Sequence, residues 1–130
     1  MNERKSGIRR LEQKRAEQAW RCIQDINNRK NDFWAEYRGT VKKVPSLILT
    51  NGLGQTLAYL KSKGGVEGEI YNHLQEWLCN GWVITWWNGK GAELIDRLMR
   101  KSSNKYRMVT REALLFLTWL KRFADAVLPK

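Results

Sequence analysis

The sequence predicts an all-α fold, in which residues 1–130 form one domain, a bundle of five or six helices with a long N-terminal helix. Apolar residues recur at intervals of three and four along most of the chain, which is the period of an amphipathic helix. A chain of 130 residues fits one core, and its 42% hydrophobic content is enough for a packed interior. The segment with clear strand propensity, WVITWW at residues 82–87, has no second strand to pair with, so we expect an apolar connection or a short helical turn there.

The first expected element is an amphipathic helix of more than 30 residues, from about Arg4 to Tyr37. Arg29 and Lys30 interrupt its apolar stripe and mark a potential bend. Gly39 and Pro45 bracket the next break, so we expect a second helix from Pro45 to about residue 61, because proline fits the first turn of a helix.

The stretch TNGLG, residues 50–54, combines a turn signal with a helical pattern. Asn51-Gly52 is a strong turn dipeptide. Four leucines nevertheless fall on one face of a continuous helix: Leu49, Leu53, Leu57 and Leu60. We therefore expect a helix that carries both glycines, with Gly52 allowing close packing in the bundle. Asn51, Gly54 and Gln55 then form a face of little bulk for a neighbouring subunit or an RNA backbone.

Three further elements follow. The glycine-rich connection KSKGGVEGE, residues 61–69, lacks the ending of a phosphate-binding loop and follows no strand. A third helix is expected over residues 68–80, a short helix over 92–100, and a last helix from residues 106–110 to 128. Their expected inward residues are Ile70, Leu74, Trp77, Leu78, Leu94, Ile95, Leu98, Met99, Leu114, Leu117, Leu120, Ala124 and Val127.

The sequence offers no catalytic constellation, so we expect no enzyme activity, no cofactor and no metal ion. His73, the only histidine, fits a hydrogen-bonded structural residue, because neither a Ser-His-Asp arrangement nor an HExxH zinc site can be built around it. Cys22 and Cys79 lack CxxC spacing and are expected to be buried thiols rather than a disulfide or metal ligands. A small metal-dependent nuclease that uses Glu67, Glu69 or Glu76 remains an alternative.

The charge of the chain indicates a polyanionic partner. The chain has 24 Lys and Arg against 13 Asp and Glu, a net charge of +11, which favours nucleic acid first and a membrane surface second. No stretch approaches the roughly 18 to 20 apolar residues of a membrane span, and the N-terminus is too charged for a secretory signal, so we expect a cytoplasmic protein without a membrane partner. Six basic residues and no acidic residue lie between Arg97 and Arg111, which form either a phosphate-contacting surface or an ordinary solvated connection.

The tryptophans divide into two groups. Trp77 and Trp119 lie within apolar helical stripes and are expected in the core. Trp82, Trp86 and Trp87 are either buried or form a docking patch for a partner protein.

Two segments resemble the signature regions of a known family. They are YRGTVKKVPSLILTNGLGQTLAYLKSK, Tyr37 to Lys63, and YRMVTREALLFLTWLKRFADAVL, Tyr106 to Leu128. Together, in order and spacing, they are similar to the small helical subunit of type III-B CRISPR effector complexes, the Cmr small subunit. The resemblance implies a non-catalytic helical subunit whose copies stack head to tail beside the backbone subunits that hold the guide RNA. It also implies that RNA cleavage belongs to the backbone subunits and nuclease activity to the large subunit.

The resulting hypothesis is an RNA-binding scaffold subunit in antiviral defence, with guide RNA, target RNA, the other Cmr subunits and further copies of itself as partners. The expected phosphate contacts are Lys42, Lys43, Lys61, Lys63, Arg107, Arg111, Lys121 and Arg122, with Arg100, Lys101 and Lys105 as additions. Contacts of this kind carry no sequence information, which suits a subunit that accepts any guide. The alternative from another class is a free-standing single-strand nucleic-acid-binding protein.

Overall fold

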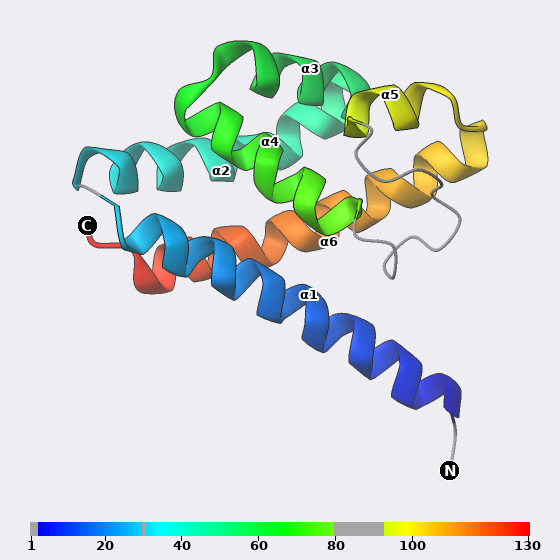
Figure 1. Cartoon of the computed structure of the whole chain (residues 1–130), viewed down its shortest axis with the longest axis horizontal. Helices are drawn as coiled ribbons and strands as arrows, with labels where there is room; N and C mark the ends of the chain where they lie inside the picture. The colour runs from blue at the N-terminus through cyan, green and yellow to red at the C-terminus, as the bar shows by residue number, and fades with distance from the viewer. Residues whose placement is uncertain (1–2, 30, 80–92) are drawn as a thin grey trace.

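Six α-helices make up the computed structural model, which describes residues 3–29, 31–79 and 93–130 (Figure 1). The helices are α1 Glu3–Asn27, α2 Asn31–Asn51, α3 Leu53–Lys63, α4 Gly65–Leu78, α5 Leu94–Met99 and α6 Ser103–Val127. No strand occurs among these residues, and the predicted all-α class is confirmed. The expected connection at residues 82–87 lies outside the described residues.

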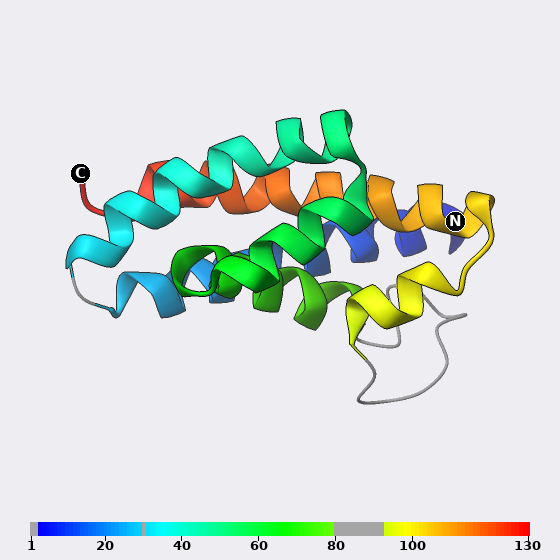
Figure 2. The same cartoon turned by 90° about the horizontal axis from the view of Figure 1, so that it is seen from above.

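The helix α6 runs through the middle of the bundle and packs against α1, α2 and α4 (Figures 1 and 2). The helices α1 and α6 run in the same direction, because Arg15 meets Glu112 and, further along both, Trp20 meets Phe123. The N-terminal part of α1 extends beyond the other helices (Figure 1). None of the helices in the described part of the chain is both long and apolar enough to cross a bilayer.

The expected continuous helix over residues 4–37 is wrong, because the chain breaks after Asn27 and resumes at Asn31 as α2. The backbone tightens at the break, where the N–H of Arg29 donates to the carbonyl of Ile26 at 3.0 Å. The indole N–H of Trp34 donates to the same carbonyl at 2.9 Å, which satisfies an acceptor that the helix end leaves open. The potential bend at Arg29 is thus a complete break, stabilised by a side chain of the next helix.

The expected break between Gly39 and Pro45 is also wrong, because α2 continues through both residues to Asn51. Proline removes a helical hydrogen bond and crowds the preceding turn. Burial compensates here, since Val41, Val44 and Ile48 on one face of α2 are 0–2% exposed. Tertiary packing therefore overrides the local signal.

The helix break lies at Gly52, where φ is +85° and ψ is 159°. This conformation is accessible essentially to glycine alone. The carbonyl of Gly52 then accepts from the backbone N–H of Thr56 at 3.2 Å and from its hydroxyl at 2.9 Å, which begins α3 in a new register. The predicted leucine stripe therefore splits: Leu49 on α2 is 76% exposed, whereas Leu53, Leu57 and Leu60 on α3 are fully buried.

The remaining elements follow the predicted order with shifted boundaries. The chain turns tightly at Gly64, with φ +66°, so the connection before α4 is shorter than expected. The predicted inward residues of α4 are all buried: Ile70, Leu74, Trp77 and Leu78. On α5, Leu94 and Leu98 are buried and Ile95 packs against the core, but Met99 is 71% exposed and its predicted inward position is wrong. The predicted stripe of α6 is confirmed, with Leu117, Leu120 and Ala124 buried and Leu114, Trp119 and Val127 partly buried against them.

A buried carboxylate links α1, α4 and α6. Glu112 accepts from the guanidinium of Arg15 at 2.6 and 2.8 Å and from the indole N–H of Trp77 at 2.9 Å. The side chains of Arg15 and Glu112 are only 7% and 12% exposed. The Trp77 ring stacks on Phe116 with 5.5 Å between centroids. One acidic residue of α6 thus aligns two other helices.

We expect Glu112→Ala to lower the free energy of unfolding by about 3–5 kcal/mol, because it leaves the buried guanidinium of Arg15 without a counter-ion. Urea unfolding followed by circular dichroism measures the change. The control is Asp125→Ala on the same helix, which removes the partner of Lys42 in a pair whose side chains are 47% and 44% exposed. The control should change stability by less than about 0.5 kcal/mol. Equal losses in the two variants would contradict a special role for the buried network.

We expect Gly52→Ala to cost about 1–3 kcal/mol, because alanine is strained in the backbone conformation of this residue. Gly39→Ala should instead raise stability by about 0.5–1 kcal/mol, since Gly39 is inside α2 and a Cβ there meets nothing within 4 Å. The same unfolding measurement compares them, and a stabilising Gly52→Ala would show that the helix break is not fixed by this glycine.

Candidate nucleic-acid and subunit interfaces

Four basic side chains lie along the solvent-facing side of α6: Arg107, Arg111, Lys121 and Arg122. All four are exposed. At the 100° per residue of an α-helix they fall within an arc of about 100°, so they form one line, which we call the α6 basic stripe. Arg107 donates to the amide oxygen of Asn104 at 2.9 Å, and within the described residues none of the four pairs with a carboxylate. The structure thus brings together four of the five predicted contacts on the last helix, and Lys105 lies outside the stripe.

Two predicted contacts, Lys42 and Arg100, form exposed ion pairs with carboxylates of the same chain. Lys42 lies 3.1 Å from Asp125, and Arg100 lies 3.3 Å from Asp96. Both pairs are exposed, so water and salt screen them strongly. Lys42 borders the α6 basic stripe through Asp125, whereas Arg100 lies beyond α5. Contact with RNA would require each cation to exchange a carboxylate for a phosphate.

Lys61 is held in a network between α3, α4 and the residue before α5. Its ammonium lies 2.8 Å from Glu93, and the hydroxyl of Tyr71 donates to the other oxygen of that carboxylate at 2.7 Å. Hydrogen bonds from Lys61 and then Tyr71 lower the pKa of Glu93 below its usual range. Burial, followed by the Glu93 hydrogen bond, raises the pKa of Tyr71. Lys61 therefore neutralises an acidic group of its own chain.

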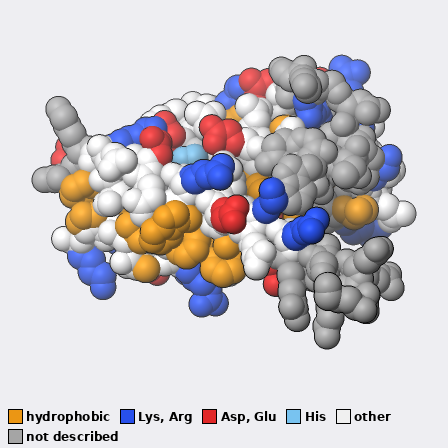
Figure 3. Space-filling model, turned by 60° about the horizontal axis from the view of Figure 1, so that its bottom comes forward, with side chains coloured by type: hydrophobic (Ala, Val, Ile, Leu, Met, Phe, Trp, Pro, Cys, Tyr) orange, Lys and Arg blue, Asp and Glu red, His pale blue; other side chains and the backbone are white. Residues whose placement is uncertain are grey.

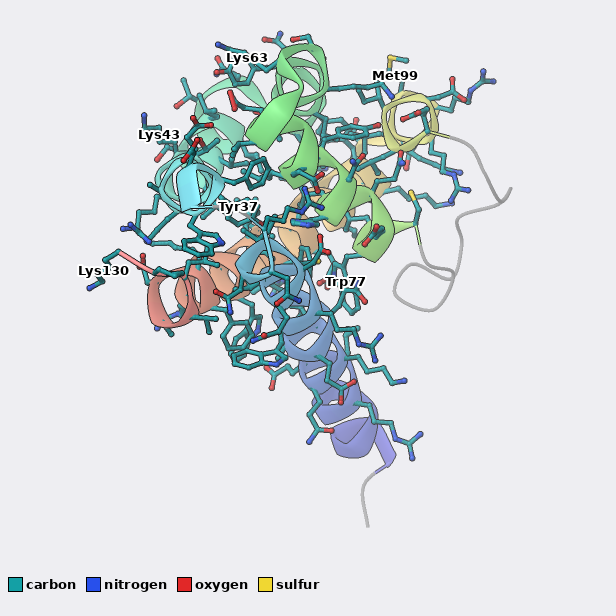
Figure 4. All side chains as sticks on the ribbon, turned by 60° about the vertical axis from the view of Figure 1, so that its left-hand side comes forward. Tyr37, Lys43, Lys63, Trp77, Met99 and Lys130 are labelled. Atoms are coloured by element: carbon teal, nitrogen blue, oxygen red, sulfur yellow. The ribbon has the colours of Figure 1, made fainter. Side chains whose placement is uncertain are left out.

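The other predicted contacts are scattered. Lys43 is exposed on α2, and Lys63 is exposed at the end of α3, with its ammonium 6.0 Å from the centre of the Tyr59 ring (Figure 4). Lys105 is exposed near the start of α6, and Lys101 is half-buried. The basic run that the sequence predicts from Arg97 onward does not form one exposed surface, because Arg97 lies on the inner face of α5 and is 7% exposed.

The predicted subunit-contact face is only partly open. Asn51 and Gln55 are exposed and line a small cavity of about 230 Å³ with Tyr59, which is 45% exposed. Gly54, in contrast, is half-buried, because its N–H donates to the hydroxyl of Tyr106 at 2.7 Å. A Cβ on Gly54 would lie 3.2 Å from that oxygen. The small size of Gly54 therefore serves a contact within the chain, between α3 and α6.

The predicted contacts Trp82, Trp86 and Trp87 lie outside the described residues. Another aromatic cluster, outside the predicted contacts, lies between α1 and α6. Trp20 is 44% exposed and meets Phe123 edge-on at 5.1 Å between ring centroids, and Trp119 meets the same ring at 5.3 Å. In the sequence, the one sign of this cluster is that Trp20 directly follows Ala19, which belongs to the buried apolar stripe of α1.

His73 has the structural contact that the sequence predicts. Its Nδ1 lies 2.8 Å from the hydroxyl of Tyr37, and both side chains are buried. Burial lowers the pKa of His73 to about 4, so the imidazole is neutral at physiological pH. Cys22 is a buried free thiol, as predicted, whereas Cys79 is a half-buried free thiol and its predicted full burial is wrong.

Comparisons with known proteins identify the family. A model of the CRISPR-associated Cas_Cmr5 family matches residues 11–127. The CRISPR system Cmr subunit Cmr5 of Thermus thermophilus is 31% identical over 99 residues, which are 76% of this chain and 81% of that protein. The crystal structure of a CRISPR-associated Cmr5 family protein from Thermus thermophilus superposes with a TM-score of 0.75 and 27% identity, covering 92% of this chain and 98% of that one. The chain therefore belongs to the Cmr5 family, the small helical subunit of the type III-B CRISPR effector (Cmr) complex.

Proposed function

We propose that this chain is a non-catalytic, RNA-binding scaffold subunit, copies of which stack along the guide-target RNA duplex beside the backbone and large subunits of the Cmr complex. The observation that carries the RNA-binding part is the α6 basic stripe, from Arg107 to Arg122. At 1.5 Å per residue the stripe is about 22 Å long, which is long enough to follow several phosphates of one strand. Its guanidinium and ammonium groups are exposed and therefore need no rearrangement of the fold to reach a phosphate.

The phosphate contacts fall into three groups: primary, secondary and additional. The stripe residues, together with Lys43 and Lys63, have no carboxylate partner in the described part of the chain and are the primary contacts. Lys42, Lys61 and Arg100 are secondary, because RNA must first displace Asp125, Glu93 or Asp96. Lys101 and Lys105 remain additional candidates next to Arg100. All of these are backbone contacts, which position RNA of any sequence.

The region around the end of α2 is the proposed contact between copies. Asn51 and Gln55 supply exposed polar groups, and Leu49 and Tyr59 supply apolar surface that is 76% and 45% exposed. Exposed apolar side chains next to amide groups are typical of a protein interface. Leu49 lies on the outer face of α2, beside the buried Ile48, and the backbone turn at Gly52 brings the start of α3 next to it.

We expect Lys121→Ala combined with Arg122→Ala to weaken RNA binding and to reduce the slope of log Kobs against log[salt] by about 1.4, because about 0.7 counterion is released per contacted phosphate of a single strand. Filter binding or fluorescence anisotropy with a generic RNA, at four salt concentrations, measures the slope. The assay uses the assembled complex as well as the chain alone.

The matched control is Arg10→Ala combined with Arg21→Ala, two exposed basic residues of α1 that lie off the stripe. The control has the same net charge as the test variant and should keep the slope of the unmodified chain. Equal slopes for both variants would show that net charge, rather than the stripe, binds RNA. Tight binding by the chain alone, unchanged by assembly, would favour the free-standing single-strand-binding alternative.

We expect Leu49→Asp to lower the association constant between copies by at least about tenfold, because it places a charge in the apolar centre of the proposed contact. Sedimentation velocity of the complex and of the concentrated chain measures association. Met108→Asp is the control, since Met108 is 58% exposed and lies two residues after Tyr106, on the opposite face of α6 from the contact with Gly54. Folding should be unaffected in both, and normal assembly of the Leu49 variant would contradict this contact.

A further inference from the structure

A polar pocket that the proposed scaffold function does not use opens between α1 and α4. It has a volume of about 550 Å³, and its wall includes Asp25, Arg29, Glu69, His73 and Glu76. Figure 3 faces this side of the molecule, where the pale blue imidazole of His73, the only histidine, lies among acidic and basic side chains. The pocket is therefore open to solvent while one of its walls reaches the core.

The pocket is acidic within a strongly basic chain. Three carboxylates line it, against the guanidinium groups of Arg21 and Arg29, although the whole chain carries a net charge of +11. Burial and then the carboxylate of Glu76 raise the pKa of the Cys22 thiol to about 12. Burial and then the charges of Glu69 and Asp25 raise the pKa of Glu76 itself. Excess negative charge in a partly buried site favours a cation.

One nitrogen and two carboxylate oxygens converge in this pocket. The ligand atoms of Asp25, Glu69 and His73 all lie within 4.8 Å of one another, and Nε2 of His73 lies 3.8 Å from Oε2 of Glu69. Two ligands of one zinc ion, each about 2.1 Å from it, can be at most about 4.2 Å apart. Small rotations of the exposed Asp25 side chain and of Glu69 would therefore complete the set. We propose that Asp25, Glu69 and His73 form a binding site for a divalent transition-metal ion such as Zn²⁺ or Co²⁺.

The imidazole of His73 is already oriented for this role. The residue is 4% exposed, and its Nδ1 is engaged by the hydroxyl of Tyr37 from α2 at 2.8 Å. Its Nε2 has no hydrogen-bond partner among the described residues and faces the pocket. Metal binding at Nε2 puts the ring proton on Nδ1, which then donates to the Tyr37 oxygen. Such an outer hydrogen bond fixes the ring of many metal-bound histidines.

Arg29 competes with the metal ion for the carboxylates of Asp25 and Glu69. Its guanidinium lies 2.7 Å from Asp25 and 2.8 Å from Glu69, so it neutralises both carboxylates while the site is empty. The Arg29 side chain is 37% exposed and follows the end of α1, where its Cζ also lies 5.3 Å from the centre of the Phe33 ring. A divalent ion must displace one positive charge and brings two. The competition predicts that removal of Arg29 strengthens metal binding.

Because the chain has a single histidine, nitrogen NMR of the ¹⁵N-histidine-labelled full chain gives an unambiguous test. Zn²⁺ is added to the metal-free protein, and isothermal titration calorimetry gives the affinity. We expect one Zn²⁺ per chain, a shift of the Nε2 resonance and a proton fixed on Nδ1. Zn²⁺ binding that leaves both ring-nitrogen signals unchanged would come from another site and would overturn the proposal.

Three variants test the ligand set. Loss of an outer-shell partner of a metal ligand already costs at least about tenfold in affinity. Glu69→Gln removes a direct ligand, so it should weaken Zn²⁺ binding by more than about tenfold. Arg29→Gln should strengthen binding several-fold, which a merely unfolded variant could not do. Glu76→Gln is the matched control on the same wall, and it should keep the His73 shift. Weaker binding in Arg29→Gln, or an unchanged affinity in Glu69→Gln, would show that these residues do not form the site.

Discussion

The hydrogen-bonded carboxylate of Glu112 is the constraint on which the bundle depends. It lies on the central helix α6 and accepts from Arg15 of α1 and Trp77 of α4, so three helices share one buried charge. A buried ion pair gains little net stability against an apolar alternative, but losing one partner is costly. The network therefore penalises any other alignment of α1 and α4 on α6. We infer that it specifies the register of the bundle more than it adds to its stability.

This alignment also separates two kinds of surface. With Glu112 turned toward α1 and α4, the face of α6 that carries Arg107, Arg111, Lys121 and Arg122 is directed to solvent. The acidic pocket of Asp25, Glu69 and Glu76 is formed between α1 and α4 instead. The basic stripe on α6 and the pocket with three carboxylates between α1 and α4 are therefore separate surfaces. A polyanion drawn to the stripe by the net charge of the chain does not meet the acidic side chains of the pocket on the same face.

Backbone breaks, rather than charges, account for the surface proposed to join copies. Asn51-Gly52 carried both a turn signal and a helical leucine pattern, and the left-handed backbone of Gly52 decides between them. Leu49 is outside in the register of α2, and the register change after Gly52 puts Leu53 in the core. Gly54 is explained by the hydroxyl of Tyr106, a residue 52 positions away. No local pattern contains that contact.

The sequence by itself determined the helical class, most of the core positions of α4 and α6 and, through two motifs, the family. These follow from periodicity and composition, which act over one or two helical turns. Only the tertiary structure decided where helices end, since Trp34 closes α1 and burial of Val41, Val44 and Ile48 carries α2 through Pro45. It also decided which cations are available, because Lys42, Lys61 and Arg100 find carboxylates and Arg97 is buried. The physical reason is that helix ends and charge pairs depend on partners distant in sequence, whereas an apolar stripe is a property of its own segment.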